Sequence, residues 1–251
     1  MTLDDGAFVR SITLLRDQVQ DFDAYPYAIP AVRNLDTLDL DPAVTFLVGE
    51  NGSGKSTLVE AIAVAAGLNP EGGTRNFGFS TRSSHSELHE RIRLVRGARR
   101  PRTEFFLRAE SFFNVATTID RLDQEPGLGR PVINAYGGRS LHEQSHGESF
   151  LALVNNRFGP EGLYILDEPE AALSIPGNLA LLRKMHELTH AGSQFVIASH
   201  SPILMGYPGA RIYELTDSGF EQVAYEDTDQ YALTRSFLED RERFFHHLLD
   251  D

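Results

Sequence analysis

The feature that most constrains this chain is a glycine-rich loop, Gly49-Glu50-Asn51-Gly52-Ser53-Gly54-Lys55-Ser56-Thr57. The residues before it, 43–48, are apolar and typical of a buried strand, and residues 58–63 after it are typical of a helix. In the order G-x-x-x-x-G-K-[ST], glycines let backbone N–H groups turn inward around phosphate oxygens, and the lysine reaches the β and γ phosphates. Strand, loop and helix together predict an α/β fold with a site for a nucleoside triphosphate.

The composition strengthens this interpretation, because Lys55 and Lys184 are the only lysines in the chain. A chance match that places one of them at the required position is therefore improbable. The predicted nucleotide is ATP and the predicted cation is Mg²⁺, held in part by the Ser56 hydroxyl. The predicted nucleotide-binding residues of the loop are Gly49, Asn51, Gly52, Ser53, Gly54, Lys55, Ser56 and Thr57.

Charge and cysteine content exclude several other classes of protein. Thirty-six acidic against 23 basic residues give a net charge of −13, which opposes nucleic-acid binding by the whole surface but leaves room for a local basic patch. The absence of cysteine excludes disulfides, thiol catalysis and cysteine-ligated zinc. No apolar run reaches the roughly 20 residues needed to span a bilayer. We therefore expect a cytoplasmic protein with no integral membrane segment.

A second motif lies downstream, where the apolar residues 163–166 end in Asp167-Glu168-Pro169. Side chains alternate along a strand, so the two carboxylates point in different directions. We predict that Asp167 belongs to the Mg²⁺ shell and that Glu168 polarises or deprotonates the attacking water. The alternative is an acidic surface turn at the end of a strand.

Two further segments carry candidate residues. His200 follows the predicted strand 194–198, where it could report on the γ-phosphate, although a histidine in such a place is often structural. Ser145, Gly147 and Glu148 precede the helical pattern 150–154, which gives the anion-binding geometry of a helix N-terminus. The simpler explanation is that Ser145 is an N-cap and Glu148 completes a capping box.

The order of these motifs resembles that of the ATP-binding-cassette ATPases over about residues 31–204. More narrowly, it resembles the branch that includes the SMC and RecF proteins and small stand-alone ATPases of the AAA type. The resemblance rests on the glycine-rich loop, Ser145-x-Gly147-Glu148, Asp167-Glu168-Pro169, Leu173-Ser174 and His200.

This resemblance implies a nucleotide sandwich in which Ser145, Gly147 and Glu148 of one subunit act on the ATP of another, so a homodimer is expected on ATP binding. It also implies that Leu173-Ser174 lies at the subunit interface and that Arg33 contacts nucleotide. The alternative for Arg33 is an ordinary solvated arginine. The sequence departs from the family pattern at His146, which replaces a glycine, and at Ser174, which replaces an aspartate.

The middle of the chain is locally basic. Residues 82–108 contain eight arginines, from Arg82 to Arg108, and could form a solvated helix face, meet an acidic protein partner or contact DNA phosphates. The spacing of His85, Leu88, Ile92 and Val95 favours an amphipathic helix. Within this region, residues 104–110 are the best strand. Its last residue, Glu110, could bind Mg²⁺, position water or cap the next segment.

The predicted architecture is one P-loop domain over residues 1–251, with a mainly parallel central sheet flanked by helices and an N-terminal antiparallel portion. Residues 1–74 and 150–225 form the nucleotide-binding core in this scheme, and 75–149 form an inserted helical, arginine-rich lobe with the signature motif. Residues 226–251 have the apolar spacing of a C-terminal helix, which we expect to pack on the core.

The leading hypothesis is an ATPase whose ATP-driven dimerisation acts on a partner. The first alternative is a DNA-associated ATPase subunit of a repair or defence system that regulates a nuclease. The energising subunit of a transporter and a P-loop kinase are the others.

Overall fold

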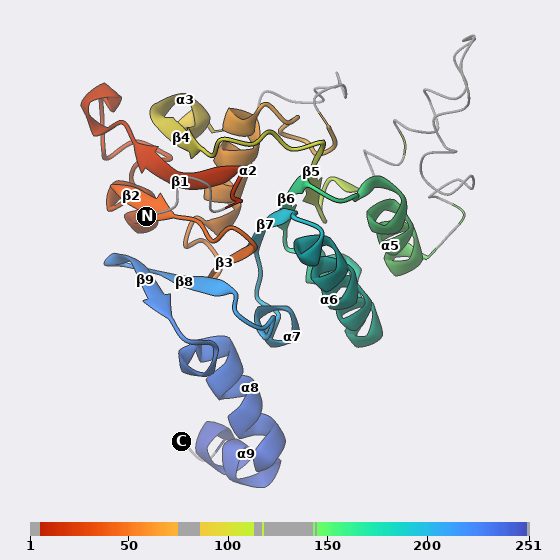
Figure 1. Cartoon of the computed structure of the whole chain (residues 1–251). Coiled ribbons are helices and arrows are strands. Elements are labelled where there is room, and N and C mark those ends of the chain that lie inside the picture. The colour runs from red at the N-terminus through yellow and green to blue at the C-terminus, as the bar shows by residue number, and fades with distance from the viewer. Residues whose placement is uncertain (1–5, 75–85, 113–116, 118–142, 144, 250–251) are drawn as a thin grey trace.

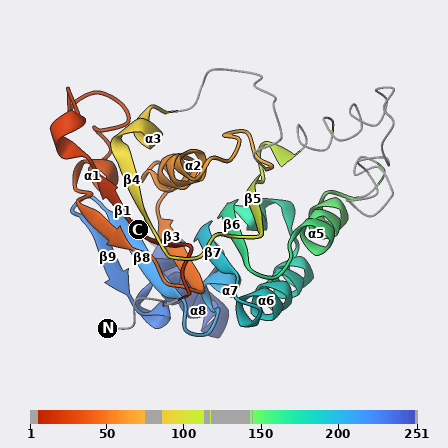
Figure 2. The same cartoon turned by 45° about the horizontal axis from the view of Figure 1, so that its top comes forward.

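The computed structural model describes residues 6–74, 86–112, 117, 143 and 145–249 (Figures 1 and 2). Arg82, His85 and most of residues 113–144 lie outside these ranges. The strands are β1 (Val9–Leu14), β2 (Thr37–Asp39), β3 (Val44–Gly49), β4 (Ile92–Arg96), β5 (Thr103–Arg108), β6 (Gly162–Asp167), β7 (Gln194–Ala198), β8 (Arg211–Thr216) and β9 (Gly219–Val223). The helices are α1 (Pro30–Arg33), α2 (Lys55–Ala66), α3 (Leu88–Arg91), α5 (His146–Arg157), α6 (Ile175–His190), α7 (Pro202–Met205), α8 (Asp229–Glu239) and α9 (Arg241–Leu249), with 3-10 turns η1 (Arg16–Gln18), η4 (Pro169–Ala172) and η5 (Tyr225–Asp227).

A six-stranded sheet forms the centre of the molecule, in the order β5-β6-β7-β3-β8-β9. All neighbouring strands in it are parallel except β9, which runs antiparallel to β8. Every residue of β3 is buried, and Phe46 and Leu47 belong to different core clusters on opposite faces. A strand covered on both faces has the continuous apolar sequence of β3. The predicted mainly parallel sheet is confirmed.

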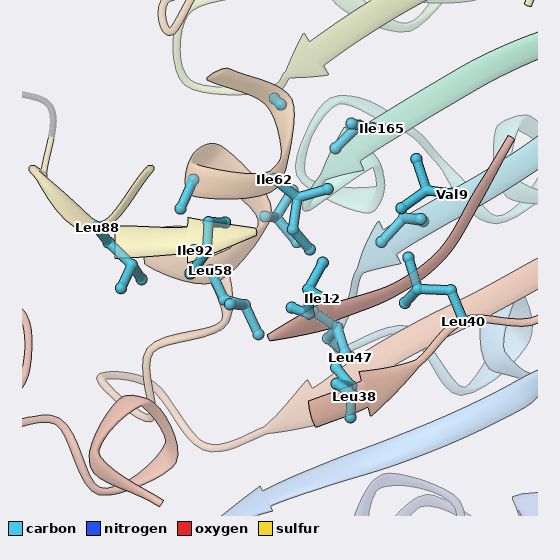
Figure 3. Close-up of a cluster of buried hydrophobic side chains, with 14 of the residues drawn as sticks. Val9, Ile12, Leu38, Leu40, Leu47, Leu58, Ile62, Leu88, Ile92 and Ile165 are labelled. Atoms are coloured by element: carbon cyan, nitrogen blue, oxygen red, sulfur yellow. The ribbon is translucent and has the colours of Figure 1, made fainter. Parts of the chain in front are cut away.

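A smaller antiparallel sheet in the order β2-β1-β4 confirms the predicted N-terminal antiparallel portion. Helix α2 shares one core cluster with both sheets: its Leu58 and Ile62 lie with Ile12 of β1 and Leu47 of β3 (Figure 3). The phosphate-loop helix is therefore held from two sides by buried apolar contacts.

The opposite face of the central sheet is covered by α5, α6 and α7, as Figure 2 shows for α5 and α6. Phe150 of α5 and Leu181 of α6 are fully buried in a cluster with Phe105 and Phe195 of the sheet. This packing fixes the position of α5, and the signature residues Ser145, Gly147 and Glu148 lie at the start of that helix.

The predicted amphipathic helix through Leu88, Ile92 and Val95 is wrong. Helix α3 ends after one turn at Arg91, and Ile92 begins a strand in which burial alternates between neighbouring residues. Val95, which helical spacing would have buried, is 39% exposed. Backbone pairing with β1 determines the conformation here, because tertiary contacts override local periodicity in a short segment.

The strands β4 and β5 both lie inside the range expected as an inserted lobe. They are members of the two sheets, so residues 92–108 belong structurally with the core. The remaining division of the chain into core and lobe stays a proposal.

The C-terminal segment forms two helices where one was predicted, and beyond the first turn of α8 it does not pack on the core as expected. No described side chain of α8 or α9 is buried, and Leu238 is 73% exposed. Phe237 of α8 contacts the rings of Phe244 and Phe245 of α9, so the two helices pack mainly on each other. Figure 1 shows this hairpin projecting from the body of the molecule.

Among the described residues, none of the helices has both the length and the apolar character that crossing a bilayer requires.

Candidate functional site

The glycine-rich loop connects the end of β3 to the start of α2, as predicted. Gly49, Gly52 and Gly54 have φ angles of 141°, 83° and 99°, a region that residues with a Cβ rarely adopt. A Cβ at Gly49 would lie 2.7 Å from the Leu215 carbonyl oxygen, and one at Gly54 would lie 2.7 Å from Cγ2 of Ile29. Glycine is therefore required at both positions for conformation and for space.

Lys55 is 3% exposed and points back into its own loop. Its Nζ donates hydrogen bonds to the carbonyl oxygens of Gly49, at 3.0 Å, and Glu50, at 2.7 Å. Burial lowers the pKa of Lys55, and the nearby carboxylates of Glu168 and Asp167 act in the opposite direction. The ammonium group is thus held at the loop by neutral carbonyls, which a phosphate oxygen could replace as a stronger, charged acceptor.

Asp167 lies at the end of β6 beside the start of α2, and it is 4% exposed. Its Oδ1 accepts a hydrogen bond of 2.8 Å from Ser56 Oγ. Burial raises its pKa to about 6, although the Arg108 guanidinium and the Ser56 hydroxyl lower it. The two predicted metal ligands, Ser56 of α2 and Asp167 of β6, are in direct contact.

Arg108 lies on the other side of Asp167, at the end of the adjacent strand β5. Its Nε is 3.1 Å from Asp167 Oδ2, and its Nη1 donates to Glu60 Oε2 at 2.7 Å. Glu60 belongs to α2, so Arg108 links the loop helix to the carboxylate strand. Nothing in the sequence distinguishes this arginine from its neighbours, because its contact with Asp167 depends on the pairing of β5 with β6.

Glu168 and His200 come together at the ends of β6 and β7. The distance from His200 Nε2 to Glu168 Oε1 is 3.5 Å. Glu168 has φ 49°, a left-handed conformation that costs about 1 kcal/mol or more for a residue with a Cβ. Its backbone N–H donates to the Ala198 carbonyl at 3.0 Å. The two successive carboxylates have different partners: Glu168 lies beside His200, and Asp167 contacts Ser56 and Arg108.

Glu170 holds the backbone at His200 through hydrogen bonds to its carboxylate. Its Oε1 accepts hydrogen bonds from the His200 backbone N–H and, at 3.0 Å, from Ser199 Oγ. Glu170 was not predicted as a site residue, although its place two residues after Glu168 was a usable signal.

A cavity of about 590 Å³ opens between these groups and the glycine-rich loop. It is lined by Glu50, Asn51, Glu168, Glu170, His200 and Gln230. A second cavity of about 570 Å³ lies along the first part of the loop and shares Glu50, Asn51 and Gln230 with the first. A cavity lined by polar side chains thus borders the loop on the side where the predicted catalytic residues lie.

The signature residues Ser145, Gly147 and Glu148 line neither cavity. Ser145 is the N-cap of α5: its Oγ accepts from the Glu148 N–H at 3.4 Å, and Glu148 Oε2 accepts from the Ser145 N–H at 3.0 Å. The capping box is therefore present, and Ser145 is exposed. Figures 1 and 2 both place α5 beyond β5 and β6 from α2, and the start of α5 lies against η4, where a Cβ on Gly147 would be 3.3 Å from the Ala172 carbonyl oxygen.

The remaining predicted residues lie at the margin. Arg33 makes an ion pair of 2.8 Å with Asp23 and lines neither cavity. Glu110 follows β5 in an exposed turn, close enough to contribute to the electrostatics of Asp167. Tyr25, which was not predicted, is 68% exposed, and its hydroxyl lies 3.5 Å from Thr57 Oγ1 at the end of the loop.

No group of three or more His, Asp or Glu side chains suited to a metal ion occurs within the described ranges. Proteins commonly hold Mg²⁺ through one or two carboxylates together with substrate phosphates. The donor set here, a hydroxyl and a carboxylate oxygen 2.8 Å apart beside a phosphate loop, has this chemistry.

The chain is similar to one family model over part of its length and to several known proteins over most of it. Residues 18–121 match the family model described as an AAA domain. The chain is 27% identical over 210 residues to the energy-coupling factor transporter ATP-binding protein EcfA2 of Methanospirillum hungatei, covering 78% of this chain and 51% of that protein. It is 25% identical over 224 residues to a putative ABC transporter ATP-binding protein of Methanothermobacter marburgensis, covering 82% and 79%. The chain thus spans about half the length of the first relative.

Among solved structures, the SMC head domain from Thermotoga maritima matches with a TM-score of 0.45 and 15% identity, covering 86% of this chain and 98% of that one. The ATP-binding cassette MJ0796, in a dimeric post-hydrolysis state bound to ADP and Pi, matches with a TM-score of 0.46 and 13% identity, covering 77% and 91%.

Proposed function

We propose that this chain, an ATPase of the ATP-binding-cassette type, hydrolyses Mg-ATP at the glycine-rich loop and closes into a head-to-head dimer when ATP is bound. The observation that carries the proposal is the direct contact between Ser56 of the loop and Asp167 of β6. It supports a shared metal site for two motifs that are far apart in the sequence.

In the proposed reaction, the loop N–H groups and Lys55 bind the phosphates, and Ser56 and Asp167 supply protein oxygens to the cation. When bound, Mg²⁺ neutralises charge on the β and γ phosphates. Glu168 takes a proton from the attacking water, and His200, 3.5 Å from the Glu168 carboxylate, faces the same cavity. The exposed ring of Tyr25 beside Thr57 offers a stacking surface for the base.

The proposal of a dimer rests on the position of Ser145. This residue is exposed and is the N-cap of α5, a helix that lies beyond β5 and β6 from the loop helix α2 in Figures 1 and 2. A second copy could bring its Ser145 and Gly147 to the open side of this loop, which would complete a site that one chain leaves half built. Subunits related by a two-fold axis would form two such sites.

A transporter subunit is a second candidate, because both sequence relatives are named as transporter ATP-binding proteins. Co-purification with an integral membrane protein would support this role for the present chain.

A DNA-associated role receives limited support from the arginine segment. Arg93 and Arg100 are exposed. Five other arginines in the described part of the segment are engaged: Arg91 with Glu90, Arg99 and Arg102 with Glu161, Arg96 with the Ala65 carbonyl and Arg108 with Asp167. The free basic surface in the described part of this segment is therefore smaller than the sequence suggests.

The decisive experiment uses the Glu168→Gln variant, which should bind ATP without hydrolysing it at an appreciable rate. We expect phosphate release to fall about 100-fold or more, and the mass in solution to double when ATP is added. A variant that hydrolyses ATP at the wild-type rate would refute the role of Glu168, and one that stays monomeric with ATP bound would refute the dimer. Repeating the mass measurement with DNA at low and high salt tests the DNA-associated role.

A further inference from the structure

Gln230, the second residue of α8, is brought to the proposed reaction site from the far end of the chain. The start of α8 is fixed firmly: the fully buried Thr228 is its N-cap, accepting from the Tyr231 N–H at 3.4 Å and donating to the Tyr225 carbonyl at 2.8 Å. The Tyr225 hydroxyl in turn donates to the Pro202 carbonyl at 2.8 Å, two residues after His200. Although the rest of the hairpin is exposed, its first turn has a defined position beside the site.

The side chain of Gln230 lines both cavities that border the loop, together with Glu50 and Asn51. The first cavity is also lined by Glu168 and His200. Its Oε1 is buried and has no hydrogen-bond partner among the described residues. A buried carbonyl-type oxygen without a donor is unfavourable, so this atom is suited to a donor that arrives with the ligand.

Of the residues that line the first cavity with Gln230, Asn51 and His200 carry side-chain donors, but neither is hydrogen-bonded to Gln230 Oε1. Glu50, Glu168 and Glu170 are acceptors when ionised, and the oxygens of a γ-phosphate are acceptors as well. A water molecule is the component of the reaction that can donate to two acceptors at once. The unpartnered Oε1 therefore matches one hydrogen of the attacking water.

We propose that Gln230 orients the attacking water, accepting a hydrogen bond from one of its hydrogens while Glu168 takes the other as a proton. The water oxygen then forms the new bond to the γ-phosphorus, the bond from that phosphorus to the β–γ bridging oxygen breaks, and ADP leaves with the electron pair. Gln230 keeps its protonation state throughout. This inference rests on the hydrolysis proposed above, and it gives the C-terminal hairpin a direct contact with the reacting groups.

The test is Gln230→Met, which keeps the length and helix propensity of the side chain and removes the amide. We expect kcat to fall about 10- to 100-fold because a misplaced nucleophile reacts slowly, with ATP affinity, measured with a fluorescent analogue, unchanged within about twofold. The matched control is Gln222→Met, since Gln222 is exposed on β9 and lines neither cavity. This control should keep wild-type kcat. Thermal unfolding of both variants checks the fold.

A second arm separates water positioning from a structural effect. In the Glu168→Gln background, adding Gln230→Met should lower the residual rate by less than about twofold, because residues acting on one water are not additive. A full additional loss, a wild-type kcat in Gln230→Met, or a raised KM at unchanged kcat would overturn the inference. If Glu168→Gln itself were fully active, the proposed hydrolysis would fail first; a normal Gln230→Met beside an inactive Glu168→Gln refutes the role of Gln230 alone.

Discussion

Ser56 Oγ donates a hydrogen bond of 2.8 Å to Asp167 Oδ1, joining two residues separated by 111 positions in the chain. The other carboxylate oxygen of Asp167 faces Arg108, which also binds Glu60 of the loop helix. Asp167 is therefore surrounded by a hydroxyl, a guanidinium and the buried ends of two strands. Its burial has a consequence for stability that can be measured without nucleotide.

The first prediction concerns Asp167→Asn and pH. Because burial raises the folded-state pKa of Asp167 from 3.8 to about 6, the folded state binds more protons than the unfolded state between these values. The contribution of Asp167 to the free energy of unfolding is thus fully favourable below about pH 4 and is lost as pH rises through 6. Asparagine does not titrate, so the stability of the variant relative to wild type should increase by roughly 2–3 kcal/mol between pH 4 and pH 7.

Urea denaturation of the two proteins at several pH values measures this difference. Comparison of two proteins at each pH cancels the titration of all other groups to first order. A difference that stays flat from pH 4 to pH 7 would mean that Asp167 is not protonated more easily in the folded state.

The second prediction uses the two lysines of the chain as a matched pair. Lys55→Ala removes a buried ammonium from the phosphate loop, whereas Lys184→Ala removes one paired with Glu187 on α6. ATP binding, measured by isothermal titration calorimetry, should weaken at least about 100-fold in the first variant because a charge-assisted contact to phosphate is lost. It should be unchanged in the second. Equal affinities in the two variants would show that Lys55 does not bind the phosphates.

The phosphate loop was predictable because it is local: nine consecutive residues between one strand and one helix define it. The same holds for the Asp167-Glu168 strand end and for the capping box of Ser145 and Glu148. Each of these three motifs is recognised from residues that are close together in the sequence.

Arg108 and Gln230 could not be predicted, because their positions depend on which strands are neighbours and where the last helix starts. Arg108 meets Asp167 through the pairing of β5 with β6. The prediction of a helix through Ile92 was wrong for the same reason: residues 92–96 form β4, which pairs with β1, more than 75 residues earlier in the chain.

The third prediction tests the exposed C-terminal hairpin with two leucines that are both in helices. Leu181 of α6 is fully buried, whereas Leu238 of α8 is 73% exposed. Leu181→Ala should lower the free energy of unfolding by about 2–5 kcal/mol, since it leaves a cavity in the core. Leu238→Ala should change it by less than about 0.5 kcal/mol. A loss above 1 kcal/mol for Leu238→Ala, measured by chemical denaturation, would mean that the hairpin packs more tightly than its exposure indicates.

The fourth prediction tests whether Ser145 acts on the ATP of the other subunit. Ser145→Arg should inactivate the protein by placing a bulky cation where the partner's nucleotide would lie, and Lys55→Ala should inactivate it by removing phosphate binding. In a mixed dimer of the two variants, one site combines an intact loop from the first chain with an intact Ser145 from the second. The other site carries both defects.

Mixing the two inactive proteins in equal amounts should therefore restore phosphate release to about one quarter of the wild-type rate, since half of the random dimers are mixed and each has one intact site of two. Mixing either variant with itself provides the control and should restore nothing. If Ser145 acted within its own chain, every site in the mixture would carry a defect and no activity would return. Recovery would thus support an α5 that acts on the partner's loop, in keeping with its place beyond β5 and β6 from its own α2.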